Sequence, residues 1–156
     1  MQHSRRIFLS TALATFVSPP LAPAQNFEPL QTSLKDQVMK IQIAFANHVF
    51  TATLENNASA LALVKMLPLA LSIEDYSNNE KISYLPSKLP GDGSAGFTNE
   101  QPGDIGYYAP WGNLAFYHGK YRYSNGLIRL GRLDGGIEPL LTKGTFSLRI
   151  HNAGAK

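Results

Sequence analysis

Apolar and polar residues alternate in several short runs of this chain, and such alternation predicts β-strands with one face in a core. The run 40–45 has isoleucine, isoleucine and phenylalanine at every second position, and the run 50–54 alternates again. Asn47 and His48 lie between these two runs and predict a turn, so the runs should form a hairpin. Further strands are predicted at 69–76, 81–85, 104–108, 113–118, 127–133 and 145–151.

One segment has helical spacing instead. Apolar residues recur at intervals of three and four from Ala60 to Leu67. Asn56 or Asn57 can cap the first turn, because an asparagine side chain accepts a hydrogen bond from a free backbone N–H there. Pro68 should end the helix, since proline disfavours helical geometry in the residue before it. A helix of about 15 Å suits the mouth of a small barrel.

The order of these elements predicts the fold class. A second short turn or helix is expected near 138–140, and the pattern contains no alternation of long helices with strands. We therefore expect a mainly β fold, a closed antiparallel eight-stranded barrel with one or two short helices, because closure removes exposed strand edges. The connection 86–103 holds three prolines and four glycines, and loops of this length are often functional or mobile.

The first 24 residues predict export. Arg5 and Arg6 precede an uncharged run, 7–17, which ends in prolines and small residues, the order of a cleavable secretory signal. The six residues from Ser4 to Leu9 match the twin-arginine address, with a general secretory signal or a membrane anchor as the alternatives. This predicts a signal peptide at 1–24, a flexible arm at 25–37, a barrel domain at 38–152, a tail at 153–156, and a periplasmic or extracellular location.

Composition narrows the classes of partner. Loss of Arg5 and Arg6 with the signal leaves 12 basic and 11 acidic side chains, a net charge of +1. A nucleic-acid-binding domain would need a clustered basic face, and no later run is long enough to span a membrane. We therefore expect neither nucleic-acid binding nor stable membrane insertion after cleavage. The chain has no cysteine, which excludes disulfides and thiolate metal sites.

The segment around the single tryptophan is the strongest candidate for a binding site. Trp111 lies on a Pro-Trp-Gly turn and offers a flat face with one N–H donor. Asn113 adds a donor and an acceptor, and Tyr108 and Tyr121 are close in sequence. Aromatic walls with a few polar groups suit a peptide or a small molecule. The alternative is structural, with Trp111 closing the core and Asn113 satisfying turn amides.

Two arginines complete the candidate set. Arg129 and Arg132 are three residues apart in a predicted strand, so their side chains should face opposite sides. An arginine that points inward needs a carboxylate partner or a ligand, and a structural ion pair is the simpler outcome. The available carboxylates are Glu74, Asp75, Asp104 and Asp134.

The sequence identifies no catalytic residue. His48, His118 and His151 do not have metal-ligand spacing such as His-Glu-x-x-His. A Gly-x-Ser-x-Gly nucleophile motif is absent, and so is a phosphate-binding glycine loop. We therefore expect no metal and no cofactor.

Two longer motifs carry a family resemblance. The runs PGDIGYYAPWGNLA at 102–115 and SNGLIRLGRL at 124–133 resemble the signatures of bacterial and archaeal proteins of cyclophilin-like fold, and Leu-Pro pairs at 67–68 and 85–86 fit the same pattern. The similarity covers roughly 39–151. It implies a compact eight-stranded barrel like a reduced cyclophilin, in a family whose function is largely unassigned.

The departure from true cyclophilins bears on activity. In those enzymes the arginine of a Phe-His-Arg segment polarises the prolyl amide, and a Gln-Gly-Gly segment is also present. Here the nearest string, Phe-Tyr-His at 116–118, lacks the arginine. We expect a module that binds a peptide or a small molecule. The alternatives are a divergent prolyl isomerase, with Arg129 or Arg132 as the donor beside Trp111 and Tyr108, and a structural interaction protein.

Overall fold

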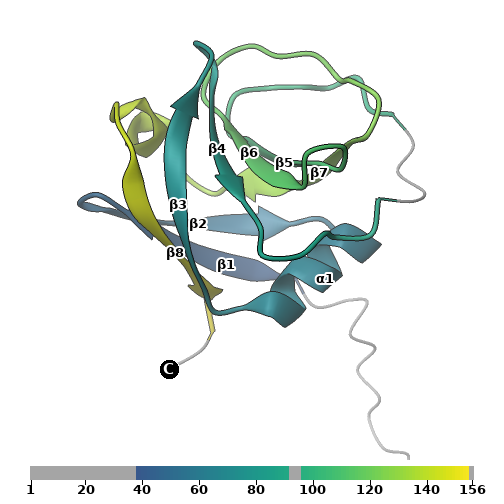
Figure 1. Ribbon diagram of the computed structural model, residues 1–156, viewed down its shortest axis with the longest axis horizontal. Coiled ribbons are helices and arrows are strands. Elements are labelled where there is room, and N and C mark those ends of the chain that lie inside the picture. The colour runs from purple at the N-terminus through teal and green to yellow at the C-terminus, as the bar shows by residue number, and fades with distance from the viewer. Residues whose placement is uncertain (1–37, 92–95, 155–156) are drawn as a thin grey trace, which may run out of the picture. The chain divides into compact units, whose positions relative to one another are not determined.

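Eight antiparallel strands close into a barrel, which confirms the predicted fold class (Figure 1). The computed structural model describes residues 38–91 and 96–154, so the predicted signal peptide and arm lie outside the described residues. The order of neighbours around the barrel is β1-β2-β7-β5-β6-β4-β3-β8, and β8 pairs with β1 to close it. The strands are β1 Lys40–Phe45, β2 His48–Leu54, β3 Leu69–Tyr76, β4 Glu80–Tyr84, β5 Asp104–Tyr108, β6 Asn113–Tyr117, β7 Leu127–Leu133 and β8 Phe146–Asn152.

The first hairpin differs by one residue from the sequence prediction. The turn is Ala46-Asn47, and His48 begins β2, where it lies opposite Phe45. Ala46 takes a positive φ of 49°, which lets the chain reverse within two residues. The prediction of His48 as a turn residue is therefore wrong. Its ring nitrogen Nε2 instead lies 2.9 Å from the hydroxyl of Thr142.

The barrel interior is filled by alternate residues of every strand and by one helix. Helix α1, Ala58–Met66, packs Ala60 and Leu63 against the main core at one end of the barrel, as predicted (Figure 1). Asn57 caps it by accepting from the backbone N–H of Ala60 at 2.9 Å. Asn57 also donates to the carbonyl of Arg129 at 2.9 Å, so one residue fixes the helix to β7. A 3₁₀ helix, η1 Glu138–Leu141, confirms the second short helix.

Strand β7 carries a bulge that changes which way its side chains point. Arg132 lies opposite Asp104 and Gly131 opposite Ile105, but the next partner, Gly106, lies opposite Arg129. Leu130 is therefore the extra residue of a β-bulge, and both arginines lie on the outer face of the barrel. The prediction that Arg129 and Arg132 face opposite sides is wrong for this reason.

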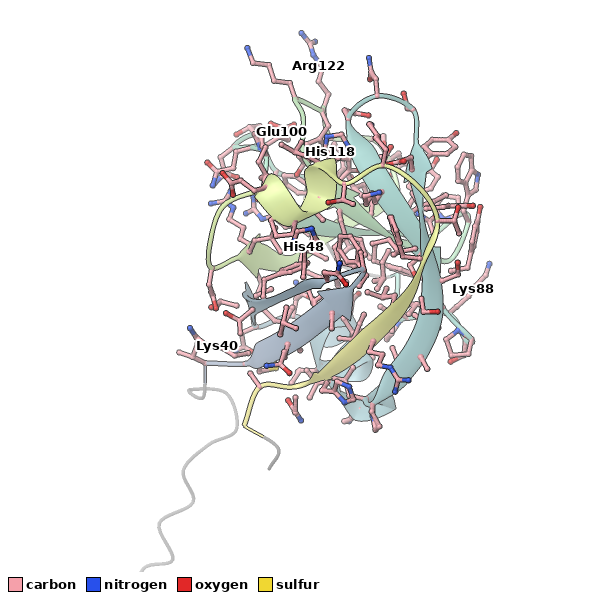
Figure 2. All side chains as sticks on the ribbon, turned by 90° about the vertical axis from the view of Figure 1, so that its left-hand side faces the viewer. Lys40, His48, Lys88, Glu100, His118 and Arg122 are labelled. Carbon is pink, nitrogen blue, oxygen red and sulfur yellow. The ribbon has the colours of Figure 1, made fainter. Side chains whose placement is uncertain are left out.

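Two long connections cover the outer face of β5, β6 and β7 and pack against each other (Figure 1). One links β4 to β5 and contributes Phe97, and the other links β6 to β7 and contributes Tyr121 and Tyr123. Together with Ala115, Tyr117 and Leu127 these rings form a second apolar cluster outside the barrel. Figure 2 shows Glu100 and Arg122 at this end of the molecule, away from Lys40. The described part of the long connection is thus tied down by packing.

A charged residue lies inside the barrel. Lys81 has no exposed surface, and its ammonium is 2.7 Å from Asp75 and above the rings of Phe45 and Phe146. Burial alone would raise the pKa of Asp75, but hydrogen bonds from Lys81 and from the backbone N–H of Gly144 lower it below its ordinary value. The interior charge is therefore paired within the fold.

Candidate functional site

A tight turn between β5 and β6 presents the tryptophan. The backbone N–H groups of Trp111 and Gly112 both donate to the carbonyl of Tyr108, at 3.2 and 2.8 Å. Gly112 has a φ of +75°, a left-handed conformation that side chains disfavour. The carbonyl of Gly112 then accepts from Leu85 at 3.3 Å, which joins the turn to the end of β4. Trp111 is held on a fixed backbone and remains 50% exposed.

A cavity of about 210 Å³ lies beside this turn, on the outer face of the barrel. Its floor is formed by Ile82 and Ala115, which face each other across β4 and β6. Ser124 closes one side. The walls are aromatic and come from β3, β5, β6 and the turn: Tyr76, Tyr108, Tyr117 and Trp111. The fold therefore gathers rings from four separate segments around one small space.

Trp111 meets two of these rings nearly at right angles. Its ring centroid is 5.6 Å from that of Tyr76, at an interplanar angle of 86°, and 5.5 Å from that of Tyr108, at 80°. Edge-to-face contacts of this kind are favourable beyond the area they bury. The three rings therefore support one another as the walls of the cavity.

Asn113 lines the cavity and has an unsatisfied polar atom. The residue is 2% exposed, and its side-chain nitrogen donates to the carbonyl of Leu114 at 3.1 Å. Its side-chain oxygen is buried and has no hydrogen-bond partner among the described residues. A buried acceptor without a partner costs about 1–3 kcal/mol, so a ligand donor placed here would relieve that cost.

Glu80 supplies a carboxylate at the same cavity. Burial raises the pKa of Glu80 above its ordinary value, and a hydrogen bond with the Tyr117 hydroxyl opposes that rise in part. Burial and the neighbouring Glu80 charge raise the pKa of Tyr117 as well, so the tyrosine keeps its proton and donates it. Within the described part of the chain, no lysine or arginine forms an ion pair with Glu80.

The two arginines belong to a neighbouring network centred on Asp104. Asp104 is fully buried and accepts from Arg132 Nε, from the Tyr121 hydroxyl at 2.7 Å and from the backbone N–H of Gln101 at 3.1 Å. Arg129 lies 3.9 Å from the same carboxylate. This is the ion pair expected for these arginines, with Asp104 as the partner among the four candidates, although it lies on the outer face.

Both arginines make further hydrogen bonds within the chain. Arg129 donates to Glu55 through Nε and to the Asn99 side chain at 2.8 Å, and its guanidinium lies 4.7 Å from the ring centre of Phe97. Arg132 donates to the carbonyl of Asn99 at 3.0 Å. The guanidinium groups therefore anchor the connection 96–103 to the barrel.

The six candidate residues thus fall into two groups. Tyr108, Trp111 and Asn113 line the cavity, whereas Tyr121, Arg129 and Arg132 belong to the Asp104 network. Six other residues that line the cavity were not among the candidates, including Tyr76, Glu80 and Tyr117. Glu80 and Tyr117 are paired across β4 and β6, and no local motif signals that pairing. The sequence shows that these residues are polar or aromatic. It does not show that the order of the strands places them beside Trp111.

The three histidines of the described residues do not form a site. His48 contacts Thr142, and His118 lies near Lys81, Lys143 and Asp75, with its pKa lowered mainly by burial. Within residues 38–91 and 96–154, no three histidine, aspartate or glutamate side chains are grouped so that they could hold a metal ion. The same residues contain no helix that is long and apolar enough to cross a membrane.

Comparison with known proteins identifies a structure of similar fold and the family of the chain. The barrel resembles the solution structure of the hypothetical protein AF2241 from Archaeoglobus fulgidus, with a TM-score of 0.54, 14% sequence identity, and coverage of 74% of this chain and 95% of that chain. At this identity the likeness concerns the fold alone. No curated protein matches the sequence. The model of the Cyclophilin-like family matches residues 43–151, and the chain belongs to that family.

Proposed function

We propose that this protein is an exported binding module whose cavity at Trp111 and Asn113 holds a peptide segment or a small molecule. The observation that carries the proposal is that Asn113 lines the aromatic cavity while its buried side-chain oxygen has no hydrogen-bond partner among the described residues. Native folds satisfy nearly all buried polar atoms. An aromatic cavity with a few polar lining residues, one of which has an unpartnered acceptor, is the arrangement expected of a ligand site.

The state of Trp111 supports binding over a purely structural role. A tryptophan that closed the core would be buried, whereas Trp111 is half exposed and meets Tyr76 and Tyr108 nearly at right angles. The main core consists of other side chains, such as Leu114 and Phe116. The barrel therefore does not need the indole to fill its interior, and the ring is free to contact a ligand.

The isomerase alternative has less support. Catalysis of prolyl rotation needs a donor aimed at the amide nitrogen beside an apolar pocket. Arg129 and Arg132 direct their donors to Glu55, Asp104 and Asn99 instead. Neither arginine lines the cavity of Trp111, so the aromatic pocket and the cationic donors are separate in this fold.

Fluorescence of the purified protein tests the proposal directly, because Trp111 is the sole tryptophan of the chain. Titration with peptide and metabolite libraries should find ligands that shift its emission. Asn113→Ala should weaken such a ligand at least tenfold, since it removes the open acceptor. Asn125→Ala is the matched control, because Asn125 is exposed and does not line the cavity. The proposal fails if no library member shifts the emission, or if an experimental structure shows the cavity filled by the protein's own side chains.

A further inference from the structure

We infer that the cavity beside Trp111 recognises an organic cation, specifically the ammonium group of an alkylamine or a lysine side chain. This inference rests on the proposed binding function and adds the chemical class of the ligand. Three independent features of the cavity lead to it: the orientation of its rings, the charge of its wall and its size.

The rings form two electron-rich walls around a corner. Trp111 stands almost perpendicular to both Tyr76 and Tyr108, at 86° and 80°, so ring faces are presented in more than one direction. Tyr76 is 40% exposed and Trp111 is 50% exposed, which leaves ring surface available. A cation over an aromatic face is attracted by the ring quadrupole, most strongly over tryptophan. Such corners of rings hold ammonium groups in other proteins.

The polar groups that line the cavity favour a ligand group that is positively charged and donates hydrogen bonds. The Glu80 carboxylate lines the cavity without an ion-pair partner in the described part of the chain. Asn113 also lines the cavity, and its buried side-chain oxygen has no hydrogen-bond partner among the described residues. The nearby hydroxyl of Tyr117 is already donated to Glu80. An ammonium has three donors and no acceptor, so it can pair with the Glu80 carboxylate, whereas a carboxylate ligand would meet a like charge.

The size of the cavity suits a single head group with a short chain. The volume of about 210 Å³ lies below the range of about 300–1,000 Å³ typical of sites for drug-sized molecules. A short alkylammonium fits this space, and a lysine side chain of a peptide fits it with its backbone outside.

The test compares three probes of equal length that differ only in charge: pentylammonium, 1-pentanol and pentanoate. Binding to the purified protein is followed by Trp111 emission and by calorimetry at neutral pH. We expect pentylammonium to bind at least tenfold more tightly than pentanol, and pentanoate not to bind. An Nα-acetyl-lysine methylamide probe shows whether the ammonium group belongs to a peptide or to a free amine. Tighter binding than pentylammonium indicates a lysine side chain of a peptide, and equal binding indicates a free alkylamine.

Three variants assign the effect to Glu80. Glu80→Gln should weaken pentylammonium binding at least tenfold, and Glu80→Lys should abolish it. Glu74→Gln is the control, because Glu74 is exposed on β3 and does not line the cavity, so its loss should change affinity by less than twofold. Circular dichroism confirms that each variant is folded.

The outcomes separate the two proposals. Equal binding of pentylammonium and pentanol, or full affinity in Glu80→Gln, overturns the inference about the cation and leaves the binding function standing. If the libraries yield a ligand that carries no ammonium and occupies the same cavity, the inference is again overturned. If no probe and no library member shifts Trp111 emission, the proposed binding function itself fails.

Discussion

Tyr117 and Tyr121 stack with their ring centroids 3.6 Å apart and their planes within 7°. The stack joins the two polar centres of the outer face. Tyr117 donates to Glu80 at the cavity, and Tyr121 donates to Asp104 in the arginine network at 2.7 Å. The network therefore positions a wall of the cavity without contacting a ligand there.

Removal of the Asp104 charge should destabilise the protein strongly. Asp104→Asn removes the buried carboxylate to which Arg132 donates, and loss of a hydrogen bond to a charged group costs about 1.5–3 kcal/mol. Urea unfolding followed by circular dichroism measures the loss. Glu55→Gln removes the half-exposed partner of Arg129 and should cost less than about 1 kcal/mol. Equal losses in the two variants would contradict the central role of Asp104.

The seam between β2 and β7 depends on a glycine. A Cβ at Gly131 would lie 2.7 Å from the Cα of Leu54 and still closer to the carbonyl oxygen of Thr53, both backbone atoms that cannot move alone. Gly131→Ala should therefore cost about 3 kcal/mol or more through overpacking. Gly135→Ala is the control, because no atom lies within 4 Å of its added Cβ. Thermal unfolding compares them, and a Gly131→Ala protein as stable as the control would refute the account.

Alternation in the sequence was sufficient to predict the barrel. Each strand begins and ends within two residues of its predicted position, because half-buried strands in a small barrel must repeat with a period of two. Helix α1 was equally clear, since an asparagine cap and Pro68 mark its two ends. These features depend on residues that are close together in the chain, so they can be recognised in a single sequence.

The site was only partly predictable because it depends on non-local features. The alternation of inward and outward side chains is interrupted by the bulge at Leu130. Arg129 and Arg132 therefore lie on the same face of the sheet, although their spacing in the sequence predicts opposite faces. In β4, the same rule would place Ile82 inside and Lys81 outside. The structure reverses this, with Lys81 paired to Asp75 in the interior and Ile82 on the cavity floor. Which of these side chains points into the barrel depends on its partners in neighbouring strands. A single sequence does not reveal those partners.

Prolyl isomerisation should not be accelerated by this protein. The donors of Arg129 and Arg132 are held by Glu55, Asp104 and Asn99. A cis/trans assay on an X–Pro peptide should show the uncatalysed rate, with exchange over tens to hundreds of seconds. Arg129→Ala and Trp111→Ala should give the same rate. Acceleration that is lost in either variant would establish an isomerase with a new donor arrangement and remove the binding module as the leading proposal.

Export should require both arginines of the leader. In a twin-arginine route, replacing Arg5 and Arg6 by lysine keeps the charge but removes the recognised pair. The double variant should therefore remain in the cytoplasm, whereas a general secretory signal would tolerate it. Cell fractionation with immunoblotting measures this, and a host without the twin-arginine translocase is the control. Terminal sequencing of the exported protein should begin at Gln25, and normal export of the double variant would refute the route.

Glu80 should lower the stability of the folded protein at neutral pH. Burial raises the pKa of Glu80 above its ordinary value of 4.5, so the folded state binds this proton more tightly than the unfolded chain does. Its contribution to stability is therefore greatest when the carboxyl is protonated, and it declines as the pH rises through the unfolded pKa and then the folded pKa. Glu80→Gln cannot ionise, and its amide oxygen still accepts from Tyr117.

The variant should accordingly be more stable than the natural protein at pH 7, and this advantage should shrink to nothing below about pH 4, where Glu is protonated in both states. Thermal unfolding between pH 3 and pH 8 measures the difference, with Glu74→Gln as the control for net charge. A Glu80→Gln protein that is less stable at pH 7 would show that the carboxylate is needed for folding. If instead the variant gains stability and loses affinity for pentylammonium, the carboxylate opposes folding and favours the ligand, as expected of a binding residue.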